Sequence, residues 1–130
     1  MPRSAWFCAT VLALAAGSSA CAPGGATSSA PQGAVPAAFR GLGTEPFWRV
    51  EVRGKTLIYA TPDSAARALD VVSRVDRSDE TVLEATLEGS ALVLTVRPEA
   101  CSDGMSDRSY PYVATLRIGA SERKGCALAL

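Results

Sequence analysis

Trp48-Arg49-Val50-Glu51-Val52-Arg53 and Thr56-Leu57-Ile58-Tyr59-Ala60-Thr61 are the two stretches that decide the fold class. In the first stretch apolar and charged residues alternate, which is the period of a half-buried β-strand. The second stretch is rich in β-branched and aromatic residues, which favour strands. Because Arg53-Gly54-Lys55 between them is typical of a tight turn, the two stretches predict an antiparallel hairpin.

The remainder of the chain repeats this pattern. Pro62-Asp63 ends the hairpin, residues 64–68 are expected to form a helical turn or a loop, and Thr81–Leu87 could instead be helical, although Gly89 disfavours that. About seven short strands separated by turn signals are typical of a small antiparallel β-barrel or sandwich, so we predict an all-β fold. The further strands are expected at 69–75, 81–87, 91–97, 112–118 and 126–130.

Residues 1–20 differ from the rest and resemble a secretory signal peptide. Arg3 is their only charge, the mostly apolar run Ala5–Ala16 follows, and small residues close the segment. The run is shorter than the roughly 20 apolar residues that a membrane-spanning helix needs. The alternative is a buried core helix. We therefore predict that the chain is exported.

Ser18-Ser19-Ala20-Cys21 resembles a bacterial lipobox, which implies a diacylglycerol on the Cys21 thiol and an anchor in the membrane. The alternative is ordinary cleavage that leaves Cys21 as a free N-terminal thiol. Residues 22–38 contain three prolines, three glycines and no charge, a composition that favours a flexible tether. The prediction is a β-domain over 39–130, held at the bacterial envelope and facing the periplasm, with inner and outer membrane both open.

Signal-peptide removal and lipidation, as predicted, would give the four cysteines different roles. Cys8 lies in the predicted signal peptide and Cys21 is the predicted lipidation site, which leaves Cys101 and Cys126. Export implies an oxidising compartment, in which two remaining cysteines usually pair. The bridge would close a loop of about 26 residues. Two separate buried thiols are the alternative, and two thiolates without histidine fall short of the four ligands of a usual metal site.

Charge and composition exclude several function classes. Thirteen Lys and Arg balance thirteen Asp and Glu, and there is no histidine. Scattered charge is unsuited to nucleic acid, whose phosphates require clustered positive charge. Without histidine, Ser-His and Cys-His nucleophile pairs are impossible. Removal of Arg3 would leave twelve basic against thirteen acidic residues, a net charge near −1. No cofactor is predicted.

Three segments are not explained by strand patterning: a Gly-Thr-Glu-Pro-Phe-Trp start at 43–48, a Cys-Ser-Asp-Gly-Met-Ser-Asp centre at 101–107 and a Gly-Cys-Ala end at 125–127. Together they resemble a family of small bacterial lipoproteins with no established activity. The resemblance covers roughly residues 39–127 and implies a compact envelope domain in which Cys101 and Cys126 pair. The layout is also loosely similar to membrane-bound inhibitors of c-type lysozyme and to META-type domains, without residue-by-residue matches.

The candidate site residues lie in the first of these segments and in residues 101–112, which begin with the second. The central segment is predicted to be a rigid loop, because its serines and aspartates can hydrogen-bond local amides and Asp103-Gly104 favours a turn. A Ca²⁺ site at Asp103 and Asp107 and a ligand-facing loop are the alternatives. Trp48 is either a core anchor or part of a binding rim. The candidate binding residues are Glu45, Trp48, Ser102, Asp103, Met105, Asp107, Arg108 and Tyr110.

The function predicted from these features is a lipid-anchored envelope domain with a binding or structural role and no enzymatic activity. The expected partners are the membrane and an envelope protein or glycan. One alternative is inhibition of a lysozyme-like hydrolase, with Arg108 or Lys124 entering an acidic cleft. The other is a carboxylate-dependent envelope enzyme that uses Glu45, Asp103 or Asp107, since glycoside cleavage requires two acids about 5–9 Å apart.

Overall fold

The computed structural model describes residues 34–130, where every regular element is a β-strand. The predicted signal peptide, the predicted lipidation site at Cys21 and the first part of the predicted tether lie outside the described residues. Within 34–130 we find no helix with the length and apolar character needed to cross a membrane. The all-β prediction is confirmed for this part of the chain.

Nine strands form one antiparallel sheet in the order β4-β3-β2-β1-β9-β8-β7-β6-β5. Consecutive strands pair as hairpins except β4 and β5, which form the two edges of the sheet, and β1 also pairs with β9, which joins the first half of the sheet to the second. The strands are β1 (Phe39–Thr44), β2 (Phe47–Arg53), β3 (Thr56–Thr61), β4 (Ser64–Asp70), β5 (Ser73–Asp76), β6 (Thr81–Leu87), β7 (Ser90–Ser102), β8 (Ser109–Ile118) and β9 (Ser121–Ala129).

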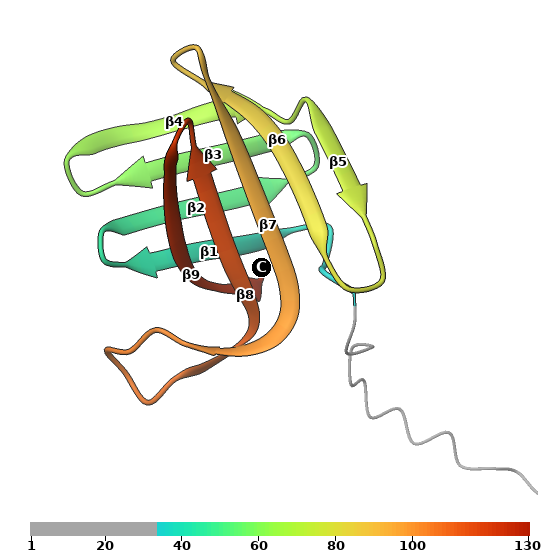
Figure 1. Cartoon of the computed structure of the whole chain (residues 1–130), viewed down its shortest axis with the longest axis vertical. Helices are drawn as coiled ribbons and strands as arrows, with labels where there is room; N and C mark the ends of the chain where they lie inside the picture. Colours follow the sequence, from blue (N-terminus) through green and yellow to red (C-terminus); the bar gives the residue numbers. More distant parts are fainter. Residues whose placement is uncertain (1–33) are drawn as a thin grey trace, which may run out of the picture.

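The sheet curls into a half-barrel. In Figure 1, strands β1 to β4 run across the view while β6 to β8 run steeply up it. The two edge strands approach each other where β4 passes into β5: the Val71 amide donates to Lys55 O, and the Val72 amide donates to Glu84 O in β6, both at 2.8 Å. These two bonds, donated by successive residues between β4 and β5, connect the two ends of the sheet.

The number of strands differs from the seven predicted. The segment 39–44, which the sequence left unassigned, forms β1, and the strand expected at 69–75 is divided into β4 and β5 at Val71 and Val72. Residues 64–68 belong to β4, so the helical turn or loop expected there is wrong. This stretch lies at the sheet edge with its side chains exposed on both faces, and therefore shows no alternation that sequence could reveal.

The core fills the concave side of the curl. Side chains of alternate residues point inward in each inner strand, as in β1, where Phe39, Gly41 and Gly43 face the core while Arg40, Leu42 and Thr44 face outward. The largest side chains with essentially no exposed surface are Phe39, Leu57, Leu83, Leu92, Leu94, Leu116, Val50, Val52 and Val96.

The described residues before β1 also contact the domain. Val35 is buried in the core, and the Arg74 guanidinium donates to Pro36 O and Ala37 O, each at 3.1 Å. The Tyr112 hydroxyl donates to Ala34 O at 3.1 Å. Residues 34–38, the described end of the predicted tether, are therefore attached to the β-domain in this structure.

Candidate functional site

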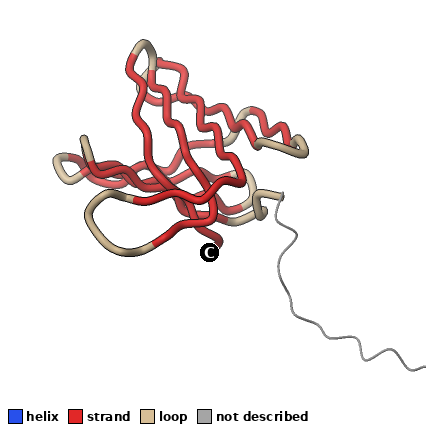
Figure 2. The backbone as a smooth tube through the Cα atoms, turned by 60° about the horizontal axis from the view of Figure 1, so that its bottom comes forward, coloured by secondary structure: helices blue, strands red, loops and turns tan. Residues whose placement is uncertain are grey.

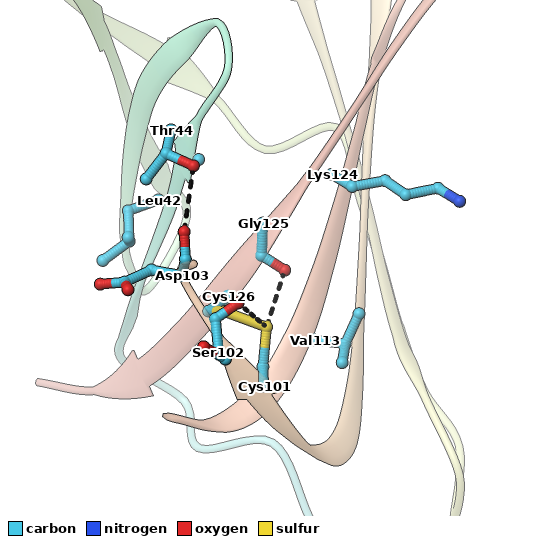
Figure 3. A pocket seen from close by; sticks show the side chains of 10 residues that line it. Leu42, Thr44, Cys101, Ser102, Asp103, Val113, Lys124, Gly125 and Cys126 are labelled. Atoms are coloured by element: carbon cyan, nitrogen blue, oxygen red, sulfur yellow. Dashed lines mark hydrogen bonds between the residues drawn. A yellow bond between two sulfur atoms is a disulfide. The ribbon is translucent and has the colours of Figure 1, made fainter. Parts of the chain in front are cut away.

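A disulfide joins Cys101 in β7 to Cys126 in β9, as predicted. The register of β7 against β8 shifts between Pro98 and Cys101, and the end of β7 turns over the outer face of the sheet toward β9. The two Cα atoms are 5.6 Å apart. Figure 3 shows the bridge, with Cys101 Sγ 3.4 Å from Gly125 O; this is a packing contact, because a disulfide sulfur has no hydrogen to donate.

The loop that follows the bridge is organised around the carboxylate of Asp103. Asp103 Oδ1 accepts the backbone N–H groups of Met105 at 3.0 Å and Ser106 at 2.9 Å. The Ser106 hydroxyl donates to both carboxylate oxygens, and the Tyr110 hydroxyl donates to Oδ2 at 3.3 Å. These bonds, first that from Met105 and then those from Ser106, lower the pKa of Asp103 below its ordinary value.

The other residues of the 103–108 loop support the same conformation, which Figure 2 shows as the long tan segment between β7 and β8. Gly104 has φ +73°, a conformation that glycine adopts without strain, and its amide donates to Ser102 Oγ. The Arg108 amide donates to Ser106 Oγ, and its guanidinium lies 5.4 Å from the Tyr110 ring centroid. The predicted local hydrogen bonding of this loop is therefore observed.

The β1–β2 turn lies beside this loop on the outer face. Thr44 Oγ1 donates to Asp103 O at 3.2 Å and links the two segments. Thr44 pairs with Phe47 in the β1–β2 register, so the two side chains share that face. Phe47 is 52% exposed and Met105 is 68% exposed, two of the few large apolar side chains of the described residues that face solvent. Glu45 is exposed in the turn.

A hollow of about 240 Å³ lies between the turn, the disulfide and β9. Figure 3 shows that the Lys124 ammonium and the Asp103 carboxylate both point away from it. The two charged side chains that line the hollow therefore do not converge in it. Its lining residues are Leu42, Gly43, Thr44, Cys101, Ser102, Asp103, Val113, Lys124, Gly125 and Cys126. Within residues 34–130 no three His, Cys, Asp or Glu side chains group as metal ligands would.

The structure separates Trp48 from the other candidate residues. Ser102, Asp103, Met105, Asp107, Arg108 and Tyr110 lie in or beside the loop, and Glu45 lies in the adjacent turn. Trp48 is only 3% exposed and belongs to the core on the concave side. Its indole occupies the space above Gly43, where a Cβ atom would overlap Nε1. Trp48 therefore packs in the core and does not form a binding rim with the loop on the outer face.

Sequence reasoning missed Thr44, Phe47 and Arg123. Phe47 precedes Trp48 in an alternating strand, so burial of Trp48 requires that Phe47 face outward, and this signal was available. Arg123 was missed because the last strand was expected to begin at Cys126, whereas β9 begins at Ser121. Correct alternation places Arg123 on the same concave face as Gly125 and Ala127.

A comparison with protein-family models, curated proteins and solved structures finds no match to this chain.

Proposed function

We propose that this chain is a membrane-anchored domain of the bacterial envelope that binds another protein through its outer face. The binding surface consists of Phe47, Met105 and Arg108 and is called here the outer patch. The observation on which the proposal rests is the exposure of Phe47 and Met105 on two segments that the Thr44–Asp103 hydrogen bond joins. Aromatic residues, methionine and arginine are enriched at the centres of protein interfaces.

The stiffness of the loop supports this proposal. The disulfide fixes one end of the 103–108 loop, and the Asp103 carboxylate receives hydrogen bonds from Met105, Ser106 and Tyr110. A surface that is already ordered loses little conformational entropy on binding, which favours affinity.

The proposed location rests on the N-terminal sequence. A basic start, a short apolar run and Ser18-Ser19-Ala20-Cys21 support export and lipidation at Cys21. The disulfide is consistent with an oxidising compartment such as the periplasm. Membership in the family of small bacterial lipoproteins belongs to the same proposal.

The loop gives less support to the two alternative functions, which are inhibition of a lysozyme-like hydrolase and carboxylate-dependent catalysis. Residues 103–108 contain two aspartates and one arginine, and this charge balance does not favour the acidic cleft of a lysozyme-like hydrolase. Of the three candidate acids, hydrogen bonds lower the pKa of Asp103, which makes this residue unsuited to the role of general acid. We therefore propose a binding role in place of catalysis.

The test is recovery of a partner from detergent-solubilised envelope by the wild-type chain and two variants. The double variant Phe47→Ser/Met105→Ser removes both apolar groups of the outer patch. Val72→Ser is the matched control, because Val72 is 75% exposed and lies in the β4–β5 connection. We expect recovery of one protein to fall at least about tenfold in the double variant and to be unchanged in the control.

Equal recovery by all three proteins would contradict the proposal. The same three proteins are assayed as inhibitors of a c-type lysozyme. Inhibition that the double variant loses would identify the partner as a lysozyme-like hydrolase, whereas inhibition that persists in the double variant would refute the outer patch as its binding surface.

A further inference from the structure

Four side chains with hydrogen-bond donors share the concave face at one end of the sheet. Tyr59 pairs with Val50 in β2 and with Arg67 in β4, and Trp48 lies two residues from Val50 on the same face. Trp48 and Tyr59 are thus diagonal neighbours, a spacing that aromatic side chains bridge. Arg123 joins them from β9, because its Nη1 donates to the Tyr59 hydroxyl at 2.9 Å.

The indole N–H of Trp48 has no hydrogen-bond partner within the described residues, although its nitrogen is fully buried. Atoms Cζ3 and Cη2 of the ring lie nearest to Gly41, and Nε1 lies above Gly43. The N–H edge therefore points toward the end of β1. The β1–β9 pairing ends at Leu42 and Cys126, so Arg123 lies on β9 past Leu42 in the direction of the β1–β2 turn. A buried donor without an acceptor is costly, and such groups are rare in folded proteins.

Arg123, another donor of this cluster, has a hydrogen-bond partner in Tyr59 but no ion-pair partner among the described residues. Its side chain is half-buried, and no carboxylate of residues 34–130 lies within ion-pair distance of it. Arg67, by contrast, forms an ion pair with Glu88. The bond from Arg123 in β9 to Tyr59 in β3 spans the two intervening strands β1 and β2, and Trp48 belongs to β2.

We propose that this end of the concave face binds the carboxylate group of a small ligand between Arg123, Tyr59 and Trp48. All three groups have donors to offer: the indole N–H, the Tyr59 hydroxyl proton, and the Arg123 N–H groups that do not contact Tyr59. The planar guanidinium matches the two oxygens of a carboxylate, and the unpaired charge of Arg123 favours an anion over a neutral acceptor.

Access to the site requires a side-chain movement. The indole nitrogen is closed to solvent, so a carboxylate reaches it only when a facing side chain turns aside. Arg123 can take part in binding, because a long side chain held by one hydrogen bond to Tyr59 can rotate and present its other N–H groups to the ligand. The site lies on the opposite face of the sheet from the outer patch, and the inference is independent of the proposed function.

The test uses tryptophan fluorescence of the full chain with Trp6→Phe, which makes Trp48 the only indole. Acetate is titrated at neutral pH and constant ionic strength, and acetamide serves as the neutral probe of the same shape. We expect acetate to change the Trp48 emission with a saturable dependence, whereas acetamide has no such effect. Arg123→Gln should weaken the acetate response at least tenfold.

Two further variants keep the test decisive. Arg117→Gln is the matched control, because Arg117 is exposed on the neighbouring strand beside Glu122. Tyr59→Phe keeps the aromatic ring and removes only the hydroxyl, so it tests the site if Arg123→Gln fails to fold, and it should also weaken the response. Equal responses to acetate and acetamide, or an acetate response that neither variant reduces, would overturn the proposal.

Discussion

In the described part of the chain, polar groups are hydrogen-bonded on one face of the β1–β9 strand pair, whereas some polar groups on the other face lack partners. On the outer face, the Asp103 carboxylate accepts four neighbouring donor groups, and Thr44 donates to Asp103 O. On the concave face, the Trp48 indole N–H has no acceptor and Arg123 no carboxylate within residues 34–130. The hydrogen bonds of the outer loop are satisfied without a ligand, whereas the concave cluster has donors without acceptors.

This difference indicates two kinds of binding. A loop whose hydrogen bonds are internally satisfied presents a fixed shape, and it binds through the apolar side chains that it exposes. Unpaired donors instead bind a ligand that supplies the missing acceptor atoms, which here are negatively charged oxygens. Substitutions in each region should therefore have separable effects.

Replacing both cysteines of the bridge, Cys101→Ser/Cys126→Ser, should lower the free energy of unfolding by about 3 kcal/mol, since the closed loop is about 26 residues long. Urea unfolding measures the loss. The change should be confined to the outer face, so the emission of Trp48 in the folded variant should match the wild type. Unchanged stability, or a shifted Trp48 emission in the native state, would contradict the separation of the two faces.

Gly43→Ala should destabilise the concave side by about 1–3 kcal/mol, because the added methyl group occupies the position of the Trp48 indole. The comparison is Gly104→Ala in the outer loop, where a Cβ atom meets nothing within 4 Å and only the positive φ opposes the substitution. Thermal unfolding with Trp48 emission distinguishes them. We expect an emission shift for Gly43→Ala alone; a shift in both variants would count against this explanation.

Asp103→Asn should destabilise the outer loop at neutral pH and have no effect in acid. The folded-state pKa of Asp103 is lowered below 3.8, so its contribution is present above that value and is lost as the pH falls through the folded pKa. Melting temperatures of the wild type and the variant should therefore converge in acid. Asp107→Asn is the control, because Asp107 makes no side-chain hydrogen bond among the described residues. A difference that persists in strong acid would refute this role.

Much of the fold was predictable because alternation and turns are local. The hairpins at 48–61 and 81–97 and the strand at 112–118 follow from period-two patterns in the sequence, and the structure confirms them. The edge strand β4 was not predictable, because its side chains are exposed on both faces and show no period. The pairing of β1 with β9 was also hidden, since it joins segments at opposite ends of the domain.

The candidate site was predictable to the extent that it is local. The hydrogen bonds of Asp103 and Ser106 lie within a few residues of each other, and the predicted loop contains them. The link from Thr44 to Asp103 joins residues far apart in sequence, as does the bond from Arg123 to Tyr59. Such contacts follow from the curl of the sheet and from its register, which the sequence alone does not define.

The most direct test of the contrast between the two faces is one acetate titration followed by nuclear magnetic resonance, with the Trp48 indole N–H and the Met105 methyl group read in the same samples. The unpaired indole should acquire an acceptor, so its N–H resonance should move with a saturable dependence on acetate, while the Met105 methyl resonance in the internally satisfied loop stays in place. A stationary indole resonance, or equal movement of both signals, would contradict the account.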